Sequence, residues 1–145
     1  MTTSPGPVAV VDTMVASALV NSRFDADRAD QFRALVERRT IVVSFATVTE
    51  LRFGAVKAGW AQLRVRGLER DLSRFLVVQP DDDLMHRCAE LRFACERIGH
   101  PLGQKIHEAD RWIAATAIAG EFDLISNDRA FVDTPGLSLL TTRSS

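Results

Sequence analysis

Val8-Ala-Val-Val-Asp12 is an unbroken apolar run that ends on an acid. Strands buried on both faces have this pattern, and they occur in parallel sheets that helices cover on each side. Ile41–Phe45 repeats the pattern, and segments with a helical apolar stripe follow each of the two runs. Buried strands that alternate with helices predict an α/β fold built around a mainly parallel sheet.

The whole chain, residues 1–145, is expected to form one domain of this kind, because no linker, repeat or low-complexity tract divides it. The expected strands are Val8–Asp12, Ile41–Phe45, Leu76–Val78, Leu124–Ser126 and Leu137–Thr141. The expected helices are Met14–Asn21, Arg28–Arg39, Ala46–Ala58, Gln62–Phe75, Leu84–Ile98 and His107–Ala119. A domain of this size encloses a substantial apolar core.

Composition excludes several classes of protein and names no partner. The net charge of −1 is unlike that of a polybasic protein that coats nucleic acid. No apolar run approaches the ~20 residues of a membrane span, and the N-terminal residues lack the pattern of a signal peptide. Cys88 and Cys95 lie about two turns apart on one expected helix, too far apart for a disulfide. We therefore expect a cytoplasmic protein with reduced cysteines and no membrane contact.

Four acids fall where a parallel sheet presents its ligand site. Asp12 ends the first expected strand, and Asp128 comes shortly after the fourth. Glu50 and Asp110 lie near the starts of two expected helices. Strand carboxyl ends and helix N-termini meet at one edge of such a sheet, and this edge is where α/β proteins bind ligands. We expect the four carboxylates to gather there although they are far apart in the sequence.

Each of these acids also has a purely structural interpretation. Asp12 is a favoured helix cap, and Thr47 with Glu50 has the spacing of a capping box. Asp110 could cap its helix and be favoured by the helix dipole there. Asp128 suits ordinary turn chemistry. These alternatives stay open at the level of the sequence.

Asp110 is the acid that this structural interpretation explains least well. Residues three and four positions further on, Ile113 and Ala114, begin the apolar stripe of the helix, so Asp110 heads that stripe and faces inward. An ionised carboxylate without a partner is costly there, and a bound cation is one way to offset the cost. The dispersed histidines His86, His100 and His107 are expected to be structural or solvated, and contact of His107, one turn before Asp110, with the same site is the alternative.

A group of carboxylates at one edge indicates a hard divalent cation, because the acids otherwise repel one another. Mg²⁺ and Mn²⁺ prefer oxygen ligands and keep bound water, which suits phosphodiester hydrolysis. The chain contains no Cys-x-x-Cys, His-Glu-x-x-His, Gly-x-Ser-x-Gly or P-loop motif that would indicate another chemistry.

Four segments, in order, resemble the motifs of the PIN-domain ribonucleases. Val-Val-Asp12-Thr13 resembles the opening motif, and Thr49-Glu50-Leu51 is similar to the helix that bears the second acid. Asp110-Arg-Trp-Ile-Ala-Ala-Thr-Ala117 closely resembles the third motif. Ser126-Asn-Asp128-Arg-Ala-Phe131 is similar to the last, with serine where threonine is commoner. The resemblance spans about residues 8–141, and its layout is similar to that of the VapC-type toxins of bacterial toxin–antitoxin pairs.

This resemblance implies a PIN-like three-layer α/β/α sandwich and a Mg²⁺- or Mn²⁺-dependent endoribonuclease, the toxin of a type II toxin–antitoxin system. Its implied partners are an RNA substrate, a small VapB-like antitoxin that inserts a peptide near the site, and a second copy of the chain. The implied metal ligands and catalytic residues are Asp12, Glu50, Asp110 and Asp128. The implied substrate-binding residues are Thr13, Ser126 and Arg129. Exposed apolar faces on Met14–Leu19 and Gln31–Val36 are expected to support the homodimer.

Two rival interpretations remain, one within the enzymes and one from another functional class. Receiver and dehalogenase-like phosphotransfer domains also carry an acid at the end of the first strand. The dehalogenase type needs a second Asp two positions later, where Met14 stands, and a receiver needs a Lys after its last strand, which this chain lacks. A catalytically silent RNA- or protein-binding module on the same fold would be favoured by the loss of an acid, and all four acids are present.

Overall fold

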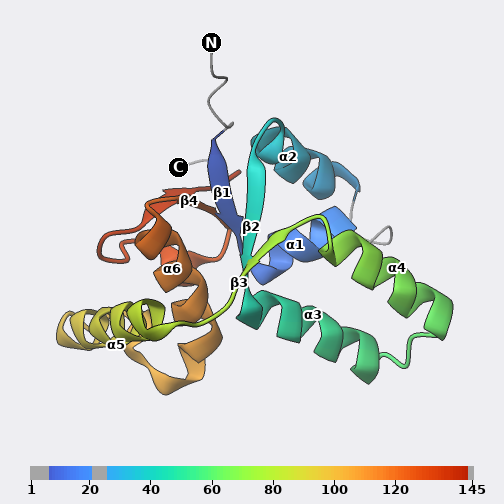
Figure 1. Ribbon diagram of the computed structural model, residues 1–145. Helices are drawn as coiled ribbons and strands as arrows, with labels where there is room; N and C mark the ends of the chain where they lie inside the picture. The colour runs from blue at the N-terminus through green and yellow to red at the C-terminus, as the bar shows by residue number, and fades with distance from the viewer. Residues whose placement is uncertain (1–6, 21–25, 144–145) are drawn as a thin grey trace, which may run out of the picture.

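A computed structural model describes residues 7–20 and 26–143, in which one parallel sheet lies between two layers of helices (Figure 1). The strands are β1 (Val8–Val11), β2 (Thr40–Ser44), β3 (Leu76–Val78), β4 (Asp123–Ile125) and β5 (Ser138–Leu140). The helices are α1 (Thr13–Val20), α2 (Ala26–Val36), α3 (Phe45–Lys57), α4 (Gln62–Leu72), α5 (Asp82–Arg97) and α6 (Glu108–Gly120). Three short 3₁₀ helices are η1 (Pro101–Gly103), η2 (Lys105–His107) and η3 (Arg129–Phe131).

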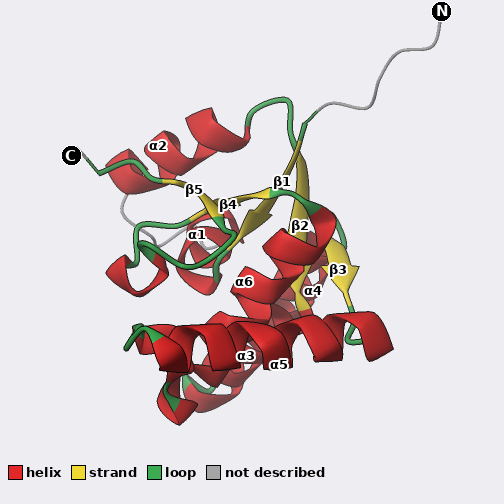
Figure 2. Cartoon of the chain, turned by 90° about the vertical axis from the view of Figure 1, so that its left-hand side faces the viewer, coloured by secondary structure: helices red, strands yellow, loops and turns green. Residues whose placement is uncertain are grey.

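The strand order β3-β2-β1-β4-β5 creates a switch in topology at the centre of the sheet (Figure 2). The chain runs outward from β1 to β2 and β3, and then crosses to the other side to form β4 and β5. All the neighbouring pairs are parallel. Ligands of doubly wound sheets bind outside the carboxyl ends of the strands at such a switch point. Because Val11 pairs with Ile125, Asp12 and Ser126 are the first residues beyond the paired strands there.

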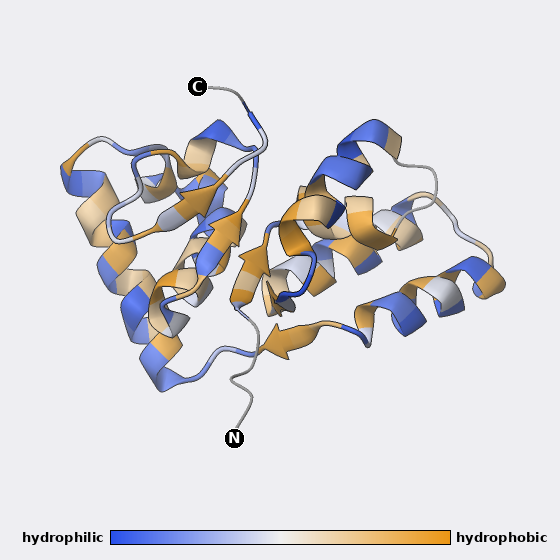
Figure 3. Ribbon diagram, turned by 90° about the horizontal axis from the view of Figure 1, so that it is seen from above, coloured by the Kyte–Doolittle hydropathy of each residue, from blue (hydrophilic) through white to orange (hydrophobic). Residues whose placement is uncertain are grey.

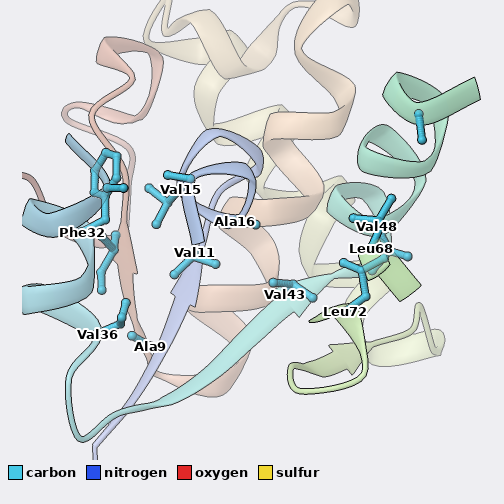
Figure 4. Close-up of a cluster of buried hydrophobic side chains, with 14 residues drawn as sticks. Ala9, Val11, Val15, Ala16, Phe32, Val36, Val43, Val48, Leu68 and Leu72 are labelled. Atoms are coloured by element: carbon cyan, nitrogen blue, oxygen red, sulfur yellow. The ribbon is translucent and has the colours of Figure 1, made fainter. Parts of the chain in front are cut away.

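Two apolar cores form because successive side chains of each strand point to opposite faces. Ala9, Val11 and Val43 face α1–α4, where they pack with the buried Phe32 (Figure 4). Val10 and its neighbours on β2 and β4 face α5 and α6. The strands are mainly apolar, whereas the helices around them carry both polar and apolar residues (Figure 3). The predicted three-layer α/β/α sandwich with a parallel central sheet is confirmed.

The expected elements are all present, and their ends differ from the prediction by up to three residues. The predicted end of the first helix, Asn21, lies outside the described residues. The second helix ends at Val36, earlier than predicted, and Arg38 then takes a left-handed conformation with φ 64°. The 3₁₀ helices were not predicted. None of the described helices is long and apolar enough to cross a membrane.

The prediction of an exposed apolar face on Gln31–Val36 for dimer contact is wrong. Phe32 and Val36 are buried in the core against the sheet, so this face of α2 is not exposed. On α1, Met14 keeps 44% of its surface exposed, while most of the other apolar side chains are buried.

Candidate active site

Asp12 lies at the switch point with its side chain almost fully enclosed, at 5% exposure. Its Oδ1 accepts a hydrogen bond from the Val15 backbone N–H at 2.8 Å, so the carboxylate caps α1. The other oxygen, Oδ2, accepts a hydrogen bond from the Ser126 hydroxyl. The helix-cap interpretation of Asp12 is therefore confirmed. A carboxylate oxygen has more than one acceptor position, so each oxygen can still face a cation.

Burial raises the pKa of Asp12 above its usual value. The hydrogen bonds from Ser126 and Val15 lower this pKa, and the charges of Asp128 and Asp110 raise it further. The net effect is a raised pKa, which means that ionised Asp12 is held in an unfavourable environment. The structure thus brings three of the four predicted acids into electrostatic contact. A cation placed among them would oppose both causes of the raised pKa, because it stabilises the ionised carboxylate.

Asp110 lies in the first turn of α6, with its side chain 29% exposed. The residue at the N-cap position is His107, which makes no side-chain capping bond, so Asp110 is not the cap of this helix. Nδ1 of His107 donates to Asp110 Oδ2 at 3.1 Å. The alternative interpretation of His107, contact with the site, is confirmed.

Ser126 is fully buried and joins two of the acids. Its hydroxyl donates to Asp12 and accepts from the Asp128 backbone N–H at 3.0 Å. In this arrangement the hydroxyl of Ser126 bonds to the acids and is enclosed by the fold, and its predicted contact with substrate stays a prediction. Asp128 itself is exposed, and its Oδ1 accepts from the Ala130 N–H at 2.9 Å as the cap of η3. The turn interpretation of Asp128 is therefore confirmed. The same residue also raises the pKa of Asp12 through its charge.

The helix α3 begins at Phe45, three residues earlier than the capping-box interpretation with Thr47 as N-cap requires. Ser44 is its N-cap and accepts from the Ala46 N–H at 3.1 Å. Thr47 is buried, and its hydroxyl accepts from the Thr13 hydroxyl at 3.3 Å. The predicted capping box between Thr47 and Glu50 is therefore wrong. Glu50 lies in the second turn of α3, where no capping role explains it.

Glu50 is separated from the other three acids in its surroundings. It is exposed, and it does not contribute to the raised pKa of Asp12. It lines a depression of about 450 Å³ between α1, α3 and α4, together with Thr13, Met14 and Trp60. The structure thus places Glu50 and Thr13 on one shared surface. Thr13 is the residue that directly follows Asp12 in the chain.

The carboxylates at this edge suit a metal ion that keeps bound water better than an ion coordinated by protein side chains alone. Within the described parts of the chain, no three His, Cys, Asp or Glu side chains are close enough to hold a metal ion by themselves. Mg²⁺ is usually bound by one or two carboxylates and keeps several waters. Asp12, Asp110 and Asp128 offer oxygen ligands alone, which fits Mg²⁺ or Mn²⁺ in that form.

Two buried polar residues that were not predicted as site residues stabilise the loop before α6. Nη1 of Arg111, 4% exposed, donates to the carbonyls of Leu102 at 2.9 Å and Gln104 at 2.7 Å. His100, 8% exposed, accepts from the Leu102 N–H at 3.1 Å through Nδ1 and donates to the Val132 carbonyl at 2.8 Å through Nε2. Together they hold the loop that carries His107 to Asp110. The signal for this role in the sequence was Arg111, a charged residue inside the mainly apolar helix α6.

Arg129, predicted to bind substrate, is exposed directly after Asp128. Among the residues that the structure describes, no acid forms an ion pair with it. Its guanidinium is therefore available at the edge where the acids lie.

Comparison with known proteins gives a family and a set of similar structures. The model of the PIN domain family matches residues 9–137. A search of curated protein sequences gives no match. The fold is similar to VapBC2 from Rickettsia felis bound to a promoter DNA fragment, with 24% identity, coverage of 92% of this chain and 98% of that chain, and a TM-score of 0.75. It is also similar to VapBC-5 from Mycobacterium tuberculosis, a member of the VapBC family of toxin–antitoxin systems, with 26% identity, coverage of 95% of this chain and 100% of that chain, and a TM-score of 0.63. A third similar structure is FitAcB from Neisseria gonorrhoeae, with 20% identity, coverage of 92% of this chain and 96% of that chain, and a TM-score of 0.71.

Proposed function

Since the chain belongs to the PIN domain family, we propose that it is a metal-dependent endoribonuclease, the toxin of a type II toxin–antitoxin pair. The observation that carries the proposal is Asp12, a buried carboxylate whose pKa is raised by burial and by two further acids. Perturbed carboxylates at a ligand-binding edge are typical of functional sites. The similarity to VapBC structures supports the toxin assignment.

Asp12 and Asp110 would hold Mg²⁺ or Mn²⁺ directly, and Asp128 and Glu50 would act directly or through water. Such an ion supplies an activated water and neutralises charge on the attacked phosphate. This chain's own residues provide the positions. Ser126 and the start of α1 fix the two oxygens of Asp12, and His107 fixes Asp110.

The substrate would approach from the exposed side of these acids. Arg129, which forms no ion pair with the described acids, would offer its guanidinium to a backbone phosphate of the RNA. Thr13 lies at the other end of the site, where its hydroxyl and the Glu50 carboxylate border the depression between α1, α3 and α4. The RNA would therefore lie across the edge of the sheet between these two surfaces.

A small VapB-like antitoxin is the proposed partner, since the similar structures include toxin–antitoxin complexes. A second hollow of about 320 Å³, lined by Trp60, Val65 and Leu68, adjoins the depression that Glu50 lines. Both hollows are mainly apolar, as expected for a surface that receives side chains of a peptide. A peptide seated there would reach Glu50 and obstruct the site.

RNA cleavage by the purified protein tests the proposed activity. We expect cleavage of total RNA with Mg²⁺ or Mn²⁺ and its loss when EDTA is added, because the acids alone repel the phosphate. Full activity in chelator, with no residual metal by elemental analysis, would overturn the metal-dependent mechanism. Absence of cleavage with either metal, together with retained RNA or protein binding, would instead favour the catalytically silent module.

A further inference from the structure

The segment after β5, which we call the C-terminal strap (Thr141–Arg143), is tied to the loop that carries Asp128. Asn127 makes most of these bonds. Its Oδ1 accepts from the Thr141 hydroxyl at 2.6 Å and from the Thr142 N–H at 2.9 Å. Its Nδ2 donates to the Thr142 hydroxyl at 2.5 Å. The strap is therefore fixed beside the acids.

Arg143 is held at the end of this strap by the same chain of hydrogen bonds. Its backbone N–H and its Nε both donate to the Thr141 hydroxyl, at 3.1 Å and 3.3 Å. That hydroxyl donates in turn to Asn127, the residue before Asp128. Because β5 is parallel to β4, the strap emerges at the carboxyl edge of the sheet, where the acids lie.

Arg143 and Arg129 differ in their charge environment from the arginines that form ion pairs on the helices. Those at other places on the surface, such as Arg52, Arg87 and Arg92, form ion pairs with Glu or Asp at 2.8–3.0 Å. In the described parts of the chain, neither Arg129 nor Arg143 has an acidic partner within that range. One of these guanidinium groups follows Asp128 directly, and the other is tied through Thr141 to Asn127, the residue before Asp128.

The site needs such positive charge if it acts on a phosphodiester. Three ionised carboxylates and one divalent cation leave a net negative charge, which repels a backbone phosphate. Guanidinium groups recognise phosphate oxygens through planar, charge-assisted hydrogen bonds. A guanidinium that the fold already holds in place also loses less conformational freedom on binding.

We propose that Arg143, fixed by Asn127 and the strap, forms a second phosphate-binding position beside Arg129 and holds the RNA backbone on the Asp128 side of the site. This inference rests on the proposed ribonuclease function and extends it to the path of the substrate. It predicts that the strap contributes to RNA affinity although it contains none of the metal-binding acids.

Equilibrium binding of a labelled oligoribonucleotide to the full chain in EDTA, where the proposed enzyme does not cleave, tests this. We expect Arg143→Gln to weaken binding about 3- to 10-fold at low salt and to reduce the slope of log affinity against log salt by about 0.7, the value for one phosphate contact on a single strand. With Mg²⁺ present, KM should rise more than kcat falls, because the lost contact is made by bound substrate as well as by the transition state.

Two further variants separate a binding role from a structural one. Asn127→Ala keeps the charge but releases the strap, so it should weaken binding in the same direction, and the double variant should bind no more weakly than Arg143→Gln alone. Arg38→Gln makes the same charge change at the opposite edge of the sheet, before β2, and should leave the affinity unchanged. If the parent binds RNA and Arg143→Gln has no larger effect than Arg38→Gln, the inference is wrong and the proposed function stands. If the parent neither binds nor cleaves RNA, the proposed function itself fails and the inference with it.

Discussion

At the scale of single residues, Asp12 combines a structural task with an electrostatic one. Its carboxylate caps α1 and accepts from Ser126, and both contacts favour the ionised form. Burial and two neighbouring acids oppose ionisation and prevail, so the pKa is raised. A residue needed only as a cap would avoid this conflict, because asparagine and serine cap helices about as well.

The first prediction concerns pH and Asp12. Because its folded pKa lies above the ordinary 3.8, the folded protein binds more protons than the unfolded chain between the two values. Metal-free stability therefore falls as the pH rises through this window, by about 1.4 kcal/mol per unit of raised pKa. Asp12→Asn does not titrate, so its stability relative to the parent should increase from pH 4 to pH 7. Urea unfolding in EDTA measures this difference, and a difference that stays constant over the range would contradict the account.

The second prediction concerns Ser126. Ser126→Ala removes the donor to Asp12 and the acceptor of the Asp128 N–H, so both acids lose their orientation. We expect Mn²⁺ affinity to fall about 10- to 100-fold, as for other residues that orient metal ligands. Thr116→Ala is the matched control, because it removes a buried hydroxyl that bonds only to the Trp112 carbonyl in α6. Calorimetric titration with Mn²⁺ should separate the two variants, and equal affinities would refute the orienting role.

The role of Ser126 shows where prediction from the sequence stops at this scale. The motif places a hydroxyl after β4, and that position is predictable. Its complete burial follows from the register of β1 and β4, which pairs Val11 with Ile125 and turns Ser126 toward Asp12. No local pattern encodes this register, so the hydroxyl was expected to face substrate.

At the scale of elements, α6 presents Asp110 because the loop before it is anchored from inside. Arg111 reaches two carbonyls of the loop, and His100 binds a third backbone group there. These contacts fix η1 and η2, and with them the position of His107 against Asp110.

The third prediction is that Arg111→Leu destabilises the fold. The change leaves the carbonyls of Leu102 and Gln104 without their donor, and an unsatisfied buried polar group costs about 1–3 kcal/mol. We expect a loss of about 2–4 kcal/mol in urea unfolding. Arg92→Leu, which breaks an exposed ion pair on α5, should cost less than about 1 kcal/mol. Similar losses for the two variants would show that the loop does not depend on Arg111.

Elements with strong patterns were predictable, and those decided by distant contacts were not. β3 was predicted with its correct ends, and β1 to within one residue, because each is an uninterrupted run of apolar residues. The N-cap of α3 was not predicted, since Ser44 and Thr47 are both good caps and the burial of Thr47 against Thr13 decides between them. The 3₁₀ turns depend on Arg111 and His100, whose partners lie in other segments.

At the scale of the whole molecule, the order of strands assembles the site. Asp12 and Asp128 follow β1 and β4, which are neighbours only because the chain crosses the sheet between β3 and β4. Asp110 comes from the helix that makes this crossing. The alternation of strands and helices predicted this edge correctly. Glu50 instead follows β2 and lies on α3, beside the depression, so its surroundings differ from those of the other acids.

The fourth prediction concerns assembly. We expect a homodimer, because large apolar side chains such as Phe53, Phe93 and Ile106 are 57%, 62% and 84% exposed, and association would remove such surfaces from water. The contact does not use the α2 face, whose apolar residues are buried. Light scattering at tens of micromolar should give twice the chain mass of 16.0 kDa. A mass of one chain at that concentration would contradict the expectation.

The central claim is that the carboxylates of this edge bind the catalytic ion, and Asp110→Asn tests it most directly. The variant keeps the shape of the side chain and removes the charge, while Asp83→Asn makes the same change in the first turn of α5, at an exposed acid paired with Arg87. Thermal unfolding of both variants and the parent with EDTA and with Mn²⁺, alongside RNA cleavage, is the measurement. The account predicts that Asp110→Asn loses both cleavage and stabilisation by Mn²⁺, with metal-free stability level or higher because a repelling charge is gone, and that Asp83→Asn retains both. Cleavage at the parent rate and equal stabilisation by Mn²⁺ in Asp110→Asn would contradict it.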